Sequence, residues 1–178
     1  MLKVYFADET KITQKSFTTL SNIVNEAYAI GEKGMWNTNA ERTTAQELRN
    51  KARNKQLIIA EYNNKLVGSV VVNILEEKNT AEFGMLAVQF ENRNKGIGYQ
   101  LIQKAEEWAK TKGSKYMRLE LLTPCNWKHP DKEILKDWYK KLGYLPQYKE
   151  SLDKAHKNLI PHLITECDFT IYTKTLTT

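Results

Sequence analysis

Hydrophobic and polar residues follow two periods along this chain, and these periods predict its helices and strands. Helices are expected where apolar residues recur every three or four positions, as from Ile97 through Leu101 and Ala105 to Trp108. Strands are expected where short apolar or alternating runs lie between turn residues. The predicted helices are 15–28, 43–54, 97–112 and 130–142, and the predicted strands are 2–7, 56–62, 66–74, 80–88, 116–122, 144–149 and 167–174.

The order of these elements indicates the fold class. Three strands in succession before the helix at 97–112, with two helices ahead of them, predict an α/β (α+β) fold with a mixed sheet and helices on both faces. Strand 80–88, the helix that follows it and strand 116–122 should form a right-handed parallel crossover. In the helix at 130–142 the predicted buried stripe is Ile134, Leu135, Trp138 and Leu142, bordered by Tyr139.

Length and composition predict one globular domain over residues 1–178. The chain is 41% hydrophobic and 27% charged, which is ordinary for a globular protein. Its apolar runs are far too short to span a bilayer, and no signal segment develops after Met1, so we expect no membrane and a cytoplasmic location. The two cysteines, Cys125 and Cys167, lie in no metal-ligand cluster, so we expect no metal. The net charge of +6 is modest, and without a basic and aromatic reader motif we expect no nucleic acid.

Two glycines mark the turn between strand 80–88 and the helix at 97–112, in the sequence Arg93-Asn94-Lys95-Gly96-Ile97-Gly98. Glycine tolerates backbone dihedrals that a Cβ would forbid, and it lets a ligand approach the main chain closely. The first turn of a helix carries N–H groups without intrahelical acceptors and a partial positive charge. The turn therefore predicts a site for phosphate or pyrophosphate, with two basic side chains beside it.

Familiar phosphate-binding motifs narrow the choice of ligand. The dinucleotide motif G-x-G-x-x-G requires a third glycine where this chain has Leu101, and no P-loop occurs. The pattern [QR]-x-x-G-x-[GA] is matched in full by Arg93, Gly96 and Gly98. With its strand and amphipathic helix, this segment resembles motif A of the GNAT N-acetyltransferase superfamily, whose turn holds the pyrophosphate of acetyl-coenzyme A.

A second segment carries the same resemblance. The run Trp138-Tyr139-Lys140-Lys141-Leu142-Gly143-Tyr144 resembles the end of motif B of that superfamily, where the tyrosine is commonly the general acid. A phenol with a pKa of about 10 stays protonated at neutral pH and can donate to the thiolate of coenzyme A. A half-buried tyrosine with a solvated hydroxyl is the alternative for Tyr139. Seven residues earlier the family often has Asn, whereas this chain has Lys132, which we expect to reach a phosphate or to face solvent.

The resemblance implies a mixed, mostly antiparallel sheet of about six to seven strands, flanked by about four helices. It implies acetyl-CoA as cofactor and a splay between the two central strands, where the pantetheine arm pairs with the backbone of the first. Carried over by position, the cofactor-binding residues are Leu86, Ala87, Val88, Arg93, Asn94, Lys95, Gly96, Ile97, Gly98 and Tyr99.

An amine acceptor must lose a proton before it attacks, because its pKa lies near 10. Glu82 is the first candidate for the base, since carboxylates on that strand serve as base in several relatives, and Glu120 is the second. A structural pairing with lysine or arginine is the more ordinary role for either. His156 and His162 are further candidates in the long connection 150–166.

The acceptor pocket should be built by the loops 30–42 and 150–166, with Trp36 and Arg42 as substrate-binding residues. The resemblance implies an N-acetyltransferase that acts on a primary amine, and we expect a small molecule because no recognition domain is appended. Transfer would be direct, in a ternary complex formed by a monomer or homodimer. Three alternatives stay open: a non-catalytic acyl-CoA sensor, a protein N-acetyltransferase and a basic interaction module.

Overall fold

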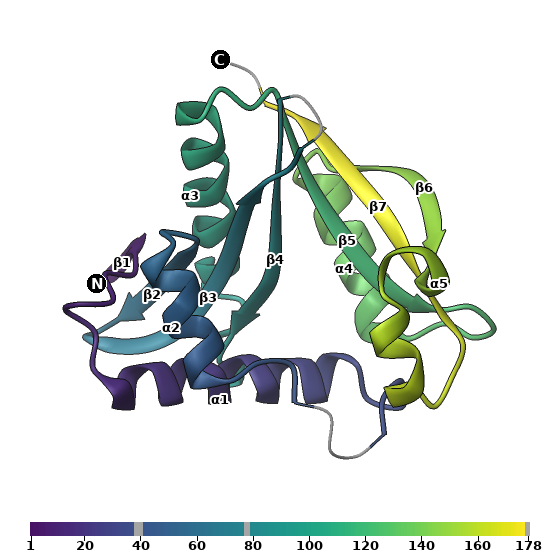
Figure 1. Ribbon diagram of the computed structural model, residues 1–178, viewed down its shortest axis with the longest axis horizontal. Coiled ribbons are helices and arrows are strands. Elements are labelled where there is room, and N and C mark those ends of the chain that lie inside the picture. Colours follow the sequence, from purple (N-terminus) through teal and green to yellow (C-terminus); the bar gives the residue numbers. More distant parts are fainter. Residues whose placement is uncertain (38–40, 77–78, 177–178) are drawn as a thin grey trace.

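The computed structural model describes residues 1–37, 41–76 and 79–176 and shows one seven-stranded sheet with helices on both faces (Figure 1). The predicted turn at 76–79 and the centre of the predicted loop at 30–42 fall partly outside the described residues. The strands are β1 (Leu2–Phe6), β2 (Leu57–Tyr62), β3 (Lys65–Ile74), β4 (Thr80–Val88), β5 (Tyr116–Pro124), β6 (Leu145–Ser151) and β7 (Cys167–Thr175). The helices are α1 (Gln14–Gly31), α2 (Ala45–Arg53), α3 (Ile97–Thr111), α4 (Pro130–Lys141) and the short α5 (Leu152–Ala155).

The sheet has the order β1-β2-β3-β4-β5-β7-β6, and only β4 and β5 pair in parallel. Their pairing covers just Thr80 to Glu82 against Tyr116 to Arg118. Beyond Glu82 the two strands diverge, and α1 crosses the open end of the resulting V (Figure 1). The sheet is therefore mixed and mostly antiparallel, as predicted, and it is divided into two halves that meet at the short parallel ladder.

A bulge in β4 lies next to this divergence. The pairing of β4 with β3 shifts register between Ser69 and Val71, and Met85 has a φ of +49°. A left-handed residue inserted into a strand bends it and raises its local twist. Gly68 pairs with Val88 just beyond the bulge, and an added Cβ there would lie 2.6 Å from the carbonyl oxygen of Ala87. The absence of a side chain at Gly68 therefore lets β3 follow the bent part of β4.

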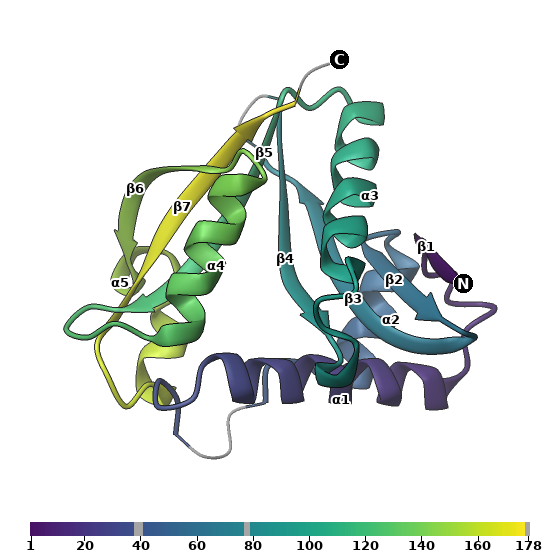
Figure 2. The same ribbon diagram turned by 180° about the vertical axis from the view of Figure 1, so that it is seen from behind.

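Two helices cover each face of the sheet. Helices α1 and α2 lie on one face, and α3 and α4 lie on the other, as the view from behind shows (Figure 2). Apolar side chains of α3, including the fully buried Leu101 and Ala105, pack with β4 and β5 in the main core. A second core lies between α1, α2 and β2 and contains Phe17, Leu20 and Leu48. The helical period predicted these faces because each helix buries one stripe.

Helix α4 departs from its predicted buried face. Ile134 is 66% exposed, whereas Lys132 and Tyr139 are buried. The inward face passes through Lys132, Leu135, Tyr139 and Leu142, at steps of three and four, and this arrangement leaves Ile134 on the outer side. The predicted buried stripe was therefore wrong at Ile134, which faces outward. A buried position on the inward side of the helix is occupied by Lys132 instead.

The long connection at 150–166 contains α5 and the 3-10 segment Lys157–His162. A further 3-10 turn, Phe90–Asn92, precedes α3. None of the helices in the described part of the chain is long and apolar enough to cross a membrane.

Candidate functional site

The predicted glycine turn lies at the N-terminus of α3. Gly96 is the N-cap residue with a φ of +76°, a left-handed conformation that favours glycine. The first backbone hydrogen bond of the helix runs from the Gln100 N–H to the Gly96 carbonyl at 3.0 Å. The N–H groups of Ile97, Gly98 and Tyr99 therefore lack intrahelical acceptors and can bind an anion.

A second feature of this turn is its close approach to α4. An added Cβ at Gly98 would lie 3.3 Å from the indole Cη2 of Trp138. Glycine at this position thus lets the two halves of the splayed sheet come together beside the anion-binding N–H groups.

The two basic side chains of the turn have nearby partners. The ammonium of Lys95 donates to Asn92 at 2.8 Å and lies over the ring of Tyr62. The guanidinium of Arg93 lies over the ring of Phe90 at 5.2 Å. Both side chains still add positive charge near the N-terminus of α3, although the Lys95 ammonium is turned toward β2.

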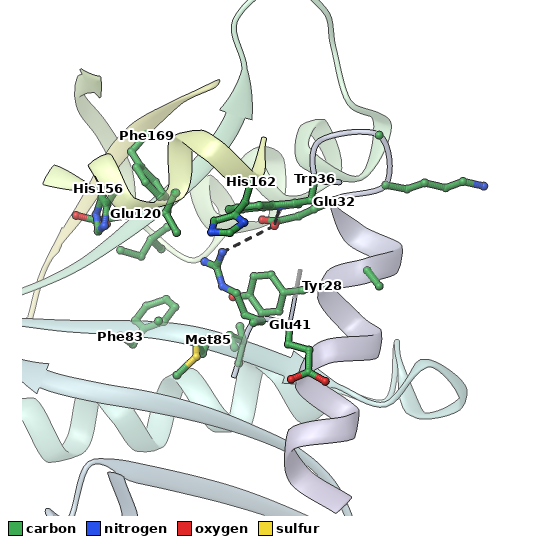
Figure 3. A pocket seen from close by; sticks show the side chains of 18 of the residues that line it. Tyr28, Glu32, Trp36, Glu41, Phe83, Met85, Glu120, His156, His162 and Phe169 are labelled. Atoms are coloured by element: carbon green, nitrogen blue, oxygen red, sulfur yellow. Dashed lines mark hydrogen bonds and ion pairs between the residues drawn. The ribbon is translucent and has the colours of Figure 1, made fainter. Parts of the chain in front are cut away.

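A cavity of about 1090 Å³ opens where β4 and β5 diverge (Figure 3). From Phe83 to Val88, β4 has no strand partner on the side of β5, so its backbone is available to a ligand there. The walls come from the end of α1, the loop that follows it, β4, β5, α4 and the segment 156–162. The lining residues that the following paragraphs use are Tyr28, Glu32, Trp36, Arg42, Glu82, Glu120, Tyr139 and His156.

Tyr139 reaches this cavity from α4. Its ring packs against Phe83 of β4 with a centroid distance of 6.1 Å, so it spans the gap between the two halves of the sheet. Burial raises the pKa of its hydroxyl above the ordinary value of 10, and the neighbouring Tyr28 acts in the same direction. The hydroxyl therefore stays protonated across the physiological pH range and can act as a proton donor.

Glu82 lies on the cavity wall, at the last position of β4 that pairs with β5. One of its oxygens, Oε2, accepts a hydrogen bond from Nε of Arg118 at 2.8 Å. Burial and the nearby carboxylate of Glu120 raise the pKa of Glu82 above 4.5, although Arg118 and His156 oppose this shift. A desolvated carboxylate with a raised pKa is a better proton acceptor than an exposed one.

Glu120 is more fully engaged than Glu82. Its Oε1 accepts a hydrogen bond from Arg118, and its Oε2 lies 2.9 Å from Nε2 of His156. The ring of His156 also packs at a tilt against the ring of Phe169, with a centroid distance of 4.7 Å. Both oxygens of Glu120 thus have protein partners, whereas only one oxygen of Glu82 does among the described contacts.

Lys132 neither faces solvent nor lies beside the anion-binding turn. Its ammonium donates to Oε1 of Glu32 at 2.7 Å, and both side chains are buried. The other oxygen of Glu32 accepts from the indole N–H of Trp36. Glu32 was not anticipated from the sequence, because a lone glutamate at the end of a helix resembles an ordinary surface residue.

Trp36 and Arg42, the predicted substrate-binding residues, both line the cavity. The guanidinium of Arg42 lies over the ring of Tyr28 at 4.6 Å and near the ring of Trp36 at 5.7 Å. Its backbone N–H donates to the side chain of Asn25 at 2.8 Å. These contacts hold the start of the segment at 42–44 against α1.

The two predicted acceptor loops are joined by backbone hydrogen bonds. Trp36 and Leu163 form an antiparallel bridge, in which the Asn37 N–H donates to the His162 carbonyl at 2.9 Å. The Ile164 N–H donates to the Met35 carbonyl at 3.0 Å. His162 lines the cavity beside this bridge. The structure therefore brings Glu82, Glu120, Tyr139, Trp36 and Arg42 to one cavity.

Comparisons with known proteins agree with this architecture. A family model described as the acetyltransferase (GNAT) family matches residues 18–144, whereas no curated protein gives a significant sequence match. The chain resembles the paia N-acetyltransferase of Thermoplasma acidophilum in complex with coenzyme A, with a TM-score of 0.72 and 18% identity over 98% of this chain and 99% of that one.

Two further solved structures cover nearly the whole chain. One is yncA from Salmonella typhimurium, solved with its cofactor acetyl-CoA, with a TM-score of 0.68 and 14% identity over 99% of this chain and 94% of that one. The other is the ribosomal-protein-S18-alanine N-acetyltransferase of Escherichia coli, with a TM-score of 0.66 and 10% identity over 100% and 96%. At these identities the likeness shows the shared fold.

Proposed function

Because the chain belongs to the acetyltransferase (GNAT) family, we propose that it transfers an acetyl group from acetyl-CoA to a primary amine of a small molecule. One observation carries this proposal: a raised-pKa carboxylate, Glu82, and a buried phenol, Tyr139, line the same cavity beside an unpaired strand edge. Acyl transfer to an amine requires a proton acceptor, a proton donor and a positioned thioester.

The residues present suit acetyl-CoA in two places. The N–H groups of Ile97, Gly98 and Tyr99 would hold the diphosphate, because they point from the start of α3 without helical acceptors. The backbone of Leu86, Ala87 and Val88 would pair with the pantetheine arm along the open edge of β4. Asn94 and the basic residues Arg93 and Lys95 complete the turn, and acetyl-CoA supplies the acetyl group as a thioester.

Each catalytic group has one task. Glu82 takes a proton from the acceptor ammonium through the oxygen that Arg118 leaves unbonded. Tyr139 holds on its hydroxyl the proton that neutralises the departing thiolate. N–H groups of β4 near Leu86 polarise the thioester carbonyl. Direct attack needs no covalent intermediate on the protein.

A small acceptor is supported by the joined loops at 31–37 and 156–164, which wall the cavity on the side away from α3.

The decisive experiment follows thiol release from acetyl-CoA against a panel of small amines and peptides. Amine-dependent release with small compounds supports the proposal, and release with peptides alone would point to a protein acceptor. If no amine stimulates release and calorimetry shows that acetyl-CoA binds, the protein is an acyl-CoA sensor.

A further inference from the structure

Two groups of charged residues lie in different parts of the cavity. Figure 3 shows Glu120 and His156 on one side of the cavity and Glu32 and Trp36, with Tyr28 next to them, on the other. The carboxylates of the first group come from β4 and β5, and His156 joins them from the end of α5. The second group comes from the end of α1 and the loop after it, with Lys132 of α4 beside it. Because the groups are separate, the charge of each can be assessed by itself.

The group on β4 and β5 is anionic. Arg118 lies within hydrogen-bond distance of both Glu82 and Glu120. The two carboxylates thus share a single guanidinium. An ammonium at Glu82 would give them a second cation, as the proposed reaction requires for an amine that arrives protonated.

The group at the end of α1 is cationic. Glu32 is bonded to Lys132 at 2.7 Å, whereas NH1 of Arg42 lies 4.0 Å from Glu32, beyond hydrogen-bond distance. Among the described residues, Glu32 is the only carboxylate within 4.0 Å of the Arg42 guanidinium. Glu32 thus faces both Lys132 and Arg42, and because Lys132 is the closer partner, one positive charge of this group is left over at Arg42.

Arg42 is also held in place for a ligand. Its guanidinium is stacked over Tyr28, and its side chain is only a quarter exposed. A guanidinium fixed by stacking loses little conformational entropy when it binds, and its planar donors match a carboxylate with two parallel hydrogen bonds. Lys33 and Glu41 also line the cavity, but they carry opposite charges and leave the balance unchanged.

We propose that the acceptor is a small amino-carboxylate, whose amine lies at Glu82 and whose carboxylate binds Arg42. The single uncompensated charge of Arg42 matches a carboxylate monoanion better than a phosphate dianion. Lys132 is then an indirect specificity residue, since it prevents Glu32 from neutralising Arg42. This proposal rests on the proposed acetyltransferase function and narrows its substrate class.

The test compares amino acids with amines of the same length that lack the carboxylate. The probes are glycine, β-alanine, 4-aminobutyrate and 6-aminohexanoate, each paired with the matching alkylamine, and alanine is paired with ethylamine. We expect at least one amino acid to have a kcat/KM more than tenfold above its paired amine. In Arg42→Gln this preference should fall by roughly 10- to 100-fold, mainly through the KM of the amino acid.

Arg49→Gln is the matched control, because Arg49 lies on α2 outside the cavity lining and pairs with Glu9 at 3.4 Å. It should leave the preference unchanged, and the KM for acetyl-CoA should be unchanged in both variants. Lys132→Met should also lower the preference, because it lets Glu32 pair with Arg42.

Equal kcat/KM values for every amino acid and its paired amine would overturn the substrate class while leaving the acetyltransferase function intact. The same conclusion would follow from a preference that Arg42→Gln does not change. If no amine at all stimulates thiol release, the proposed function fails and this proposal fails with it.

Discussion

The Nζ atom of Lys132 lies 2.7 Å from Oε1 of Glu32, although the two residues are separated by 100 positions in the sequence. The bond joins α4 to the end of α1, and thus connects the two halves of the sheet at the open end of the V. At the closed end, Glu106 of α3 accepts hydrogen bonds from Tyr144 and Lys174, which belong to the other half. Buried polar contacts therefore fix the two halves at both ends of the cavity.

The first prediction concerns the stability of this pair. Lys132→Met should lower the free energy of unfolding by about 3–5 kcal/mol, because it removes the closest cation from the buried carboxylate of Glu32 and leaves only Arg42, whose NH1 lies 4.0 Å away. The double variant Glu32→Gln with Lys132→Met should recover most of this loss, since glutamine is uncharged and keeps an oxygen for the indole of Trp36. Urea unfolding followed by circular dichroism measures both effects.

Lys136→Met is the matched control on the same helix. Lys136 pairs with Glu133 at 2.6 Å, but both side chains are substantially exposed, so the change should stay within about 0.5 kcal/mol. If the Lys132 and Lys136 variants were equally stable, the Glu32–Lys132 pair would have no special structural role.

The apolar pattern predicted most of the helices and strands, because most of them bury one periodic face; β6 is an exception, since it is largely exposed. The glycine turn was likewise located from sequence, because glycines with basic residues between a strand and a helix are typical of a tight turn that can bind an anion. The divergence of β4 and β5 was known only from the family resemblance. Its bulge centres on Met85, a residue that gives no sign of a left-handed conformation.

The charged contacts of the cavity were harder to predict than its location. Glu82 was expected either as base or in an ion pair; the structure shows the ion pair with Arg118 and places Glu82 on the cavity wall. Its role as base stays a prediction. Lys132 was expected near a phosphate or in solvent, because its partner Glu32 is remote in sequence. Long-range ion pairs leave no periodic signal, so only the three-dimensional structure reveals them.

The second prediction concerns Tyr139. Tyr139→Phe should lower kcat by about 10²- to 10⁴-fold, because it removes the proton donor to the leaving thiolate. The KM for acetyl-CoA should change little, since the ring and its packing against Phe83 are retained. Steady-state kinetics with a saturating amine measures this change.

Tyr116→Phe is the control for the loss of a tyrosine hydroxyl, because Tyr116 is exposed at the start of β5 and lies outside the cavity lining. It should keep the wild-type rate. Because burial raises the pKa of Tyr139 above 10, the wild-type rate should show no loss near pH 10 from ionisation of this residue. An unchanged kcat in Tyr139→Phe would argue for another proton donor.

The third prediction concerns the pH dependence that Glu82 causes. Burial, followed by the charge of Glu120, raises the pKa of Glu82 above 4.5. The value of kcat/KM should therefore rise as the pH increases through this raised pKa, because only the carboxylate accepts a proton. Glu82→Gln should lower kcat by about 10²- to 10⁴-fold and remove this limb of the pH profile.

The same shift affects stability with a definite sign. In the window between 4.5 and the raised pKa, the folded protein binds more protons at Glu82 than the unfolded chain does. The stability of the wild type relative to Glu82→Gln should therefore fall as the pH rises through that window. Urea unfolding of both proteins at several pH values measures the difference, and a rise with pH would show that the pKa is lowered instead.

The fourth prediction separates the structural role of Gly96 from its role in binding. Gly96 and Gly113 stand at the two ends of α3 with nearly equal φ values of +76° and +78°, and an added Cβ would meet no atom within 4 Å at either. Alanine at either position should thus cost about 1–2 kcal/mol of stability through backbone strain alone. Only Gly96→Ala should also weaken acetyl-CoA binding, by about tenfold, because relief of the strain moves the N–H groups that bind the diphosphate. Calorimetric titration with acetyl-CoA measures this effect. Equal affinities in the two variants would show that the diphosphate does not bind at this turn.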